Sequence, residues 1–473
     1  MNLKFNLKYI LYISFILLML PSFCFIIGEQ FIPTYIPITM IFFISLLIFF
    51  NKELINKLIC YYNKTPFKYL ILFVFWSIIT IFISLIRGKF FLGGFINSTI
   101  GGLLCSIIIP CIIVIFVIPK YIKVNKLFNS LYFFSWFIFI FGLIEFFVFT
   151  YNIPILQEAV SIFSNKRLLI YNSTDITRVI SGGLPRIRSI FDEPAYLGYF
   201  IFIMSPIIYE WTSSCAIKFK NKFFNKFIKS TIIPLMWINL ILTQSPIFLV
   251  FNIIFSSIYL LIVKKGYKKL VKYFVPILIL LILTSIFVLF LIKQIDFSKT
   301  YLNRIFLVLQ NLRSFDDFIM VEPSLGTRII IIINAIQMGI QNIATGIGYG
   351  NMAYMIGAKL AASNLPLTEE LVTFIKLGKT GPASTIFIKT FSETGLIGTI
   401  LLYYFIYKLY KKLSYIKNYS TFDKNIVNGL CLFLLVYAFA SIYDSNLHQP
   451  YVFIIIGSIL CLIFQQDRKW MYQ

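Results

Sequence analysis

Residues 69–86 read YLILFVFWSIITIFISLI, a run of eighteen residues without a charge. Because a hydrocarbon core of about 30 Å needs about 20 apolar residues in an α-helix, this run predicts a membrane-spanning helix. The whole chain has the same character: 59% of its 473 residues are hydrophobic, 13% are charged and the mean hydropathy is +0.88. Ordinary soluble domains are about 25% charged. The composition excludes a soluble enzyme, a disordered tail and a fibrous protein, and predicts an all-α polytopic membrane protein.

Twelve apolar runs are predicted to span the membrane. The first follows Lys4 and Lys8 and has no small-residue cleavage site, so we interpret it as an uncleaved helix rather than a signal peptide. The stretch 231–263 offers only 33 residues for two passes, so either both are short or one is re-entrant. The predicted spans lie near residues 9–27, 32–50, 69–86, 98–119, 129–150, 195–210, 231–243, 245–263, 273–292, 386–407, 427–443 and 450–465.

The basic residues set the predicted orientation. With the N-terminus in the cytoplasm, 26 of the 42 lysines and arginines fall on the inner side, as the positive-inside rule requires, and both termini are cytoplasmic. Two outer loops are long, and long loops of this kind are usually functional, although an accessory folded cap is the alternative. The predicted segments are an N-terminal five-helix membrane segment (1–150), a first long extracytoplasmic loop (151–194), a central membrane segment (195–292), a large extracytoplasmic loop (293–385) and a C-terminal three-helix membrane segment (386–473).

The predicted membrane topology explains the net charge of +24. Its basic residues lie between apolar runs, so they indicate a lipid bilayer as partner and no nucleic acid. The seven cysteines lie in apolar runs or in predicted cytoplasmic loops, and no CxxC pair occurs. Structural disulfides and a zinc site are therefore not expected.

Arginine and lysine are distributed differently across the predicted membrane. Eight of the nine arginines fall outside, whereas 25 of the 33 lysines fall inside. Topology signals do not distinguish the two cations, but the planar guanidinium binds phosphate or carboxylate in a bidentate way and ammonium does not. The partition indicates an anionic substrate group at the outer face. Ion pairing with outer acidic residues is the alternative for part of these arginines.

The first arginine cluster, Arg186-Ile-Arg188, precedes Asp192-Glu193-Pro194 and the sixth predicted span. Asp192 is suited to cap that helix, with an acidic residue and a proline in its first turn. Capping explains residues 192–194 but not the two arginines. We expect the arginines to face the mouth of a cavity in the helix bundle.

The second cluster begins at Arg328 in the late outer loop. The apolar residues 329–338 predict a helix that lies on the outer leaflet, dips into it or packs on the bundle. Gly339 follows Arg328 by about three helical turns, so both lie on one face, where the glycine would allow another helix or a lipid to approach. The sequence GIGYG at 346–350 then predicts a flexible turn. No strand precedes it, so we reject a dinucleotide site and retain a backbone anion nest as a hypothesis.

Two titratable residues complete the candidates. His448, the only histidine, lies in the short outer loop between the last two predicted spans, and histidine is a common general base near neutral pH. Glu145 lies within the fifth predicted span near its outer end. A carboxylate inside a span is a functional candidate, but one so near the interface can also reach water.

Four motifs in this order resemble those of the O-antigen polymerase and ligase superfamily, the Wzy-type polymerases and their ligase relatives. They are RSIFDEP at 188–194, the spacing of Arg328 and Gly339 (similar to an RX10G pattern), GIGYG at 346–350 and FSETGLIG at 391–398. The resemblance covers nearly the whole chain. It implies a GT-C-like, O-antigen-ligase-like fold in a bacterial cytoplasmic (inner) membrane.

The resemblance also implies a metal-independent glycosyl transfer that uses no cofactor. A polymerase of this family moves a growing glycan from undecaprenyl diphosphate onto the next lipid-linked repeat unit, and builds O-antigen or capsule. A flippase and a chain-length regulator of the same pathway are the expected partners. The expected site comprises Arg188, Arg328, Glu193 and His448 as catalytic residues, with Glu193 and His448 as alternative bases, and Arg186, Gly339, Gly348 and Glu393 as substrate-binding residues.

Two other functions remain open from the sequence. A ligase that transfers glycan to lipid A core typically carries a histidine shortly before the Glu-x-Gly-x-x-Gly segment, and residues 382–389 contain none, which favours a polymerase. A lipid-linked oligosaccharide flippase is the non-enzymatic alternative. Nearly charge-free spans and a long outer loop favour surface chemistry over transport.

Overall fold

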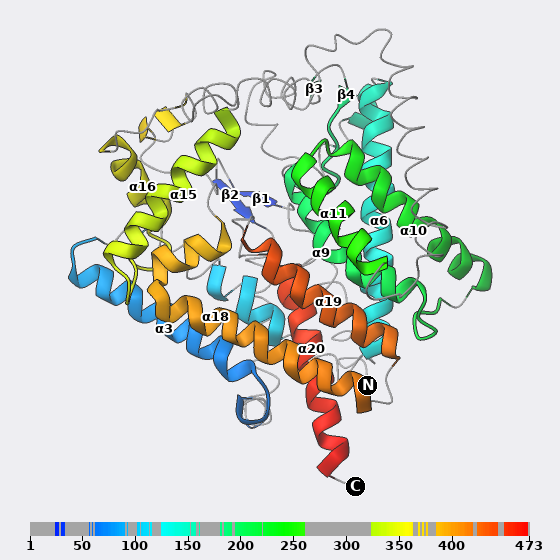
Figure 1. The fold of residues 1–473 in the computed structure, drawn as a ribbon. Helices are drawn as coiled ribbons and strands as arrows, with labels where there is room; N and C mark the ends of the chain where they lie inside the picture. The colour runs from blue at the N-terminus through cyan, green and yellow to red at the C-terminus, as the bar shows by residue number, and fades with distance from the viewer. Residues whose placement is uncertain are drawn as a thin grey trace. The chain divides into compact units, whose positions relative to one another are not determined.

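The computed structural model describes about three fifths of the chain, and its helices dominate that part (Figure 1). Two small hairpins are the strands among the described residues. The description covers, with gaps of one or two residues, residues 24–27, 30–33, 62–89, 102–115, 124–157, 180–191, 194–260, 323–362, 385–419, 423–442 and 449–471, together with a few isolated positions.

Among the described residues, three helices are long and apolar enough to cross a membrane. They are α3 (Phe67–Ile86), residues Lys126–Thr150 of α6 (Val124–Thr150) and residues Ile386–Lys417 of α18 (Ile386–Tyr419). The expectation of a helical protein is confirmed for the described residues, and the length and composition of these helices are compatible with a membrane protein. Further helices coincide with predicted spans: α9 (Pro194–Thr212), α19 (Lys424–Ala440) and α20 (Pro450–Met471).

The ambiguous stretch 231–263 forms two helices. The first, α10 (Lys222–Leu242), begins nine residues before the predicted span, and the second, α11 (Pro246–Ile258), has only 13 residues. A turn separates them, in which Gln244 takes a positive φ of 49° and Pro246 opens the second helix. Proline at the first helical position is favourable because it has no N–H to leave unsatisfied.

The predicted helix at 9–27 is wrong at its C-terminal end. Residues Cys24–Ile27 (β1) pair in antiparallel register with Gln30–Pro33 (β2), whose residues overlap the predicted start of the next span. Phenylalanine and isoleucine favour strands as well as buried helices, so hydropathy alone does not distinguish the two. The rest of spans 9–27 and 32–50, and all of span 273–292, lie outside the described residues.

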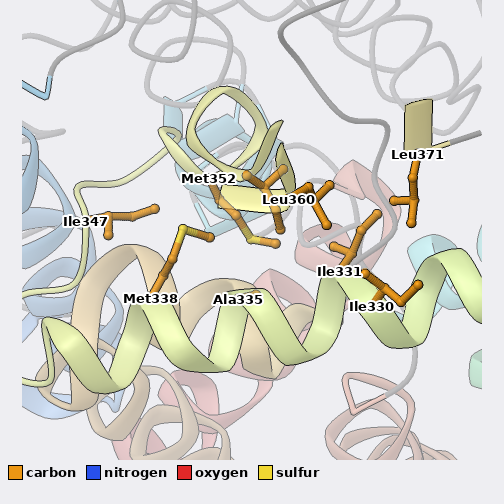
Figure 2. Packing of buried hydrophobic residues seen from close by; sticks show 9 residues of the cluster. Ile330, Ile331, Ala335, Met338, Ile347, Met352, Leu360 and Leu371 are labelled. Atoms are coloured by element: carbon orange, nitrogen blue, oxygen red, sulfur yellow. The ribbon is translucent and has the colours of Figure 1, made fainter. Parts of the chain in front are cut away.

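The segment predicted as the late outer loop contains helices that share a hydrophobic core. The helix predicted after Arg328 is confirmed as α15 (Pro323–Gln341), and a second helix, α16 (Met352–Ala361), was not predicted. Figure 2 shows the apolar face of α15 turned toward residues of α16 and its neighbours. The buried cluster consists of Ile330, Ile331, Ala335, Met338, Ile347, Met352, Ile356, Leu360 and Leu371.

The chain divides into two compact units. Unit 1 comprises Met1–Phe133, Pro206–Asn225 and Leu312–Gln473, and unit 2 comprises Phe134–Ser205 and Lys226–Asn311. Within unit 1, α3 and α18 lie side by side (Figure 1). They run antiparallel, since Tyr69 at the start of α3 contacts Tyr404, whereas Trp76, two turns further on, donates a hydrogen bond to the carbonyl of Thr394.

Candidate functional site

Arg188 forms a buried ion pair with Glu145 in unit 2. The guanidinium Nε lies 3.7 Å from Glu145 Oε1, and the two side chains are 6% and 1% exposed. The other carboxylate oxygen accepts hydrogen bonds from the backbone N–H groups of Arg188, at 2.9 Å, and of Ser189, at 2.6 Å. One carboxylate of α6 therefore holds both the backbone and the side chain of the first arginine cluster.

Further contacts fix the backbone around Arg188. Ser189 takes a positive φ of 54°, which is uncommon for a residue with a side chain, and its hydroxyl donates to the carbonyl of Ile138 at 2.8 Å. On the other side, the Ile187 N–H donates to the carbonyl of Leu242. The Arg186 Nε donates to the carbonyl of Thr243 at 3.3 Å, so both residues bind carbonyls at the end of α10.

The interpretation of Glu145 as a carboxylate that reaches water is wrong. Its side chain is buried and paired, as expected for an ionisable group held inside a helix bundle. The sequence contained a signal for this pairing: Glu145 is the only charged residue of the fifth predicted span (129–150), where a carboxylate is stabilised by a nearby cation. Spacing along the chain did not identify the partner, because Arg188 lies 43 residues away.

The glycine turn of the second cluster is built around an internal carboxylate in unit 1. Every backbone N–H from 346 to 352 donates a hydrogen bond within the protein. The N–H groups of Gly350 and Met352 both donate to the buried carboxylate of Glu393 in α18. The remaining acceptors are the carbonyls of Asn342, Ser392, Glu393 and Gly348 and the hydroxyl of Thr80.

This arrangement corrects two expectations about the turn. The turn is pinned to α3 and α18, so a flexible turn is the wrong description. The anion nest is also wrong as a ligand site, because the N–H groups that would form it are already used. The carboxylate that these amides bind is the chain's own Glu393, which is 1% exposed. A direct contact of Gly348 or Glu393 with substrate stays a prediction.

The Glu-x-Gly-x-x-Gly segment acquires a structural explanation from the same contacts. Gly395 interrupts α18 with φ 69° and ψ −169°, a combination open essentially to glycine alone. A Cβ at this position would collide with the carbonyl of Ala344, just before the turn. Glu393 thus binds the amides of the turn, while Gly395 allows the two backbones to approach.

We expect Gly395→Ala to lower the free energy of unfolding by about 2–3 kcal/mol, since it combines backbone strain with a steric collision. The matched control is Gly88→Ala. Gly88 has nearly the same φ, 68°, but a Cβ there would meet nothing within 4 Å. The control should cost roughly 1 kcal/mol. Unfolding midpoints of the purified proteins in detergent compare the two, and equal shifts would show that the approach at Gly395 is unimportant.

Arg328 lies in the N-terminal third of α15, in unit 1, and is half-buried. Its neighbour Thr327 is buried, and the Thr327 and Thr368 hydroxyl oxygens are 2.6 Å apart in a hydrogen bond. At the other end of this helix, a Cβ on Gly339 would lie 2.5 Å from the ring of Phe391 in α18. The expectation that Gly339 allows close approach is confirmed, and the approaching element is a helix.

The other predicted site residues stand as follows. Glu193 and His448 lie outside the described residues, so the choice of base stays a prediction. Arg188 belongs to unit 2 and Arg328 to unit 1, and their convergence on one substrate group stays a prediction.

Arg87 is a residue whose position the sequence did not single out. It ends α3 directly beside the glycine turn, where its guanidinium donates to the Asn342 side chain at 3.3 Å and to the carbonyl of Gly346 at 3.5 Å. It was counted among the outer arginines, and only the packing of α3 against α18 reveals its neighbours.

No family model, no curated protein and no solved structure matches the chain. In the part of the chain that the structure describes, the protein is mainly helical, has three helices long and apolar enough to cross a membrane, and contains a buried arginine–carboxylate pair.

Proposed function

We propose that the chain polymerises undecaprenyl-diphosphate-linked oligosaccharide repeat units into a surface polysaccharide, O-antigen or capsule. The reaction takes place at the outer face of a bacterial cytoplasmic membrane, on a GT-C-like bundle of twelve spans with both termini inside. The observation that carries the proposal is the buried pair of Glu145 and Arg188 at the start of the RSIFDEP motif.

Stability alone does not account for such a pair. Removing two charges from water is expensive, and well-packed apolar residues usually stabilise a protein as much or more. Ionisable groups inside membrane segments are accordingly rare and usually functional. A guanidinium held by a buried carboxylate keeps a fixed orientation, which is what bidentate recognition of a phosphate requires. The excess of arginine on the predicted outer side, eight of nine residues, supports the same role in phosphate binding.

The proposed reaction needs two chemical contributions from the protein. The acceptor hydroxyl of one lipid-linked repeat unit attacks C1 of the donor glycan, and the bond from C1 to the diphosphate oxygen breaks. Arg188 and Arg328, supported by Arg186, bind the charge that develops on the departing undecaprenyl diphosphate. A base, Glu193 or His448, accepts the proton of the attacking hydroxyl. Correct orientation of the two lipid-linked substrates supplies much of the rate.

The surface glycan of a strain lacking the gene tests the proposed function. If the protein is a polymerase, the deletion strain should retain a single attached repeat unit. The ladder of longer chains should disappear from the gel. Loss of all attached glycan would instead indicate a ligase. Loss of lipid-linked repeat units from the outer leaflet would indicate a flippase.

Orientation is tested by cysteine labelling. We expect an impermeant maleimide to label cysteines introduced at Ser324 and Asn364 in intact spheroplasts, because lysine asymmetry places both outside. The chain supplies its own control in Cys215, which is exposed and falls on the predicted cytoplasmic side. In a background without the other cysteines, Cys215 should react only after permeabilisation. Protection of both introduced cysteines, together with labelling of Cys215, would show that the orientation is opposite to the predicted one.

A further inference from the structure

A group of lysines and tyrosines lies at the end of α3 opposite the glycine turn. Here the Tyr69 and Tyr404 rings are 4.8 Å apart in an edge-on arrangement, and Lys412 Nζ donates to the carbonyl of Lys64 at 3.1 Å. These contacts join the start of α3 to the second half of α18. We call this group the lysine–tyrosine cluster: Lys64, Lys68, Tyr69, Tyr404, Lys408 and Lys412.

The cluster has a high local positive charge. Residues 62–69 and 403–417 contain six lysines and no aspartate or glutamate. At physiological ionic strength, charges interact over about 8 Å, so lysines on two packed helices raise the potential together. Topology signals explain why lysines lie at this end of the helices but not why they are arranged around tyrosine rings.

The geometry of the cluster is that of a membrane interface. The Lys68 ammonium lies 5.2 Å from the centre of the Tyr69 ring, and that of Lys408 lies 5.0 Å from the Tyr404 ring. Tyrosine places an apolar ring beside lipid chains and a hydroxyl beside headgroups, while lysine extends its charge toward the phosphates. Tyr404 is 38% exposed, so its ring is accessible from outside the protein.

We propose that the lysine–tyrosine cluster binds the headgroup phosphate of an anionic phospholipid, such as phosphatidylglycerol. In the proposed topology the lipid belongs to the cytoplasmic leaflet, on the opposite side from the glycosyl transfer. The lysines bind the phosphate, and the tyrosines contact the glycerol and the upper acyl chain. This site does not depend on the proposed polymerase activity.

The experiment measures lipid retention by the full-length protein. Native mass spectrometry from mixed micelles compares phosphatidylglycerol with phosphatidylcholine for the wild type and for Lys68→Gln/Lys408→Gln/Lys412→Gln. Each lysine near an anionic surface contributes roughly a fivefold change in affinity, so the triple variant should bind phosphatidylglycerol about 100-fold more weakly. The matched control, Lys222→Gln/Lys226→Gln/Lys229→Gln, removes three lysines of α10. It should change the affinity for phosphatidylglycerol little.

Each remaining outcome decides the proposal. Arginine in place of the same three lysines should retain the lipid, and Lys408→Gln alone should weaken retention about fivefold if the triple variant does not fold. Equal retention of phosphatidylcholine, or equal loss in the α10 control, would overturn a specific headgroup site. Displacement of the lipid by millimolar inorganic phosphate would show that the cluster binds a soluble anion instead.

Discussion

Replacing Arg328 by lysine should reduce polymer formation roughly 30- to 1000-fold, although the charge is kept. Lysine lacks the planar fork of donors, so it would lose the proposed bidentate contact with the diphosphate, which strengthens as charge develops there. The loss of one such contact costs about 2–4 kcal/mol of transition-state stabilisation. The length distribution of the glycan on a gel, at matched protein levels, measures the effect.

Other changes separate the roles of the arginines and of the base. Arg304→Lys and Arg313→Lys serve as controls and should cost little, since the sequence predicts ion pairing within the loop for both residues, which lie outside the described part of the chain. His448→Ala should reduce the rate by about 10²–10⁴-fold if His448 is the base. An unchanged rate in this variant would favour Glu193 as the base. Near-normal ladders from both Arg328→Lys and Arg328→Ala would show that Arg328 has a structural role in α15 and does not bind the diphosphate.

Glu145→Ala should destabilise the protein by about 3–5 kcal/mol. It leaves the Arg188 guanidinium buried without its carboxylate and removes the acceptor of two backbone N–H groups. Glu145→Gln should destabilise the protein less, because the glutamine side-chain oxygen still accepts hydrogen bonds from those N–H groups. Unfolding midpoints in detergent measure both variants.

A double variant distinguishes a structural pair from a functional one. Glu145→Gln/Arg188→Met removes both charges together and keeps an acceptor for the backbone, so it should be nearly as stable as the wild type. It should nevertheless form no polymer, since the cation that we propose to bind the diphosphate is gone. A stable double variant with normal ladders would show that the pair serves the fold alone.

Hydropathy predicted most of the described helices, because long runs of apolar residues such as those of α3 and α6 favour a helix that satisfies its own backbone hydrogen bonds. It failed at Cys24–Ile27, where the same residue types pair as a strand. It also missed α16, whose ten residues are too short for a span and are stabilised by packing on α15.

The candidate site was predictable as a set of residues but not as a set of contacts. Arg188, Arg328 and the glycine motifs were identified from residue type and order. The partner of Arg188 was not, since Glu145 is brought to it only by the packing of α6 in unit 2. Likewise, Glu393 was assigned to substrate because it lies in FSETGLIG, one of the motifs that resemble the polymerase and ligase superfamily. Its binding to the amides of Gly350 and Met352 depends on the break in α18 at Gly395.

The most direct test of the proposed polymerase is reconstitution of the purified protein in liposomes with undecaprenyl-diphosphate-linked repeat units as both donor and acceptor. We predict a ladder of lipid-linked oligomers, with free undecaprenyl diphosphate released for each new linkage, and the same ladder in the presence of EDTA. The Glu145→Gln/Arg188→Met variant in the same liposomes should yield repeat units of unchanged length. Wild-type protein that leaves the repeat units unjoined, while remaining folded and correctly oriented, would contradict the account.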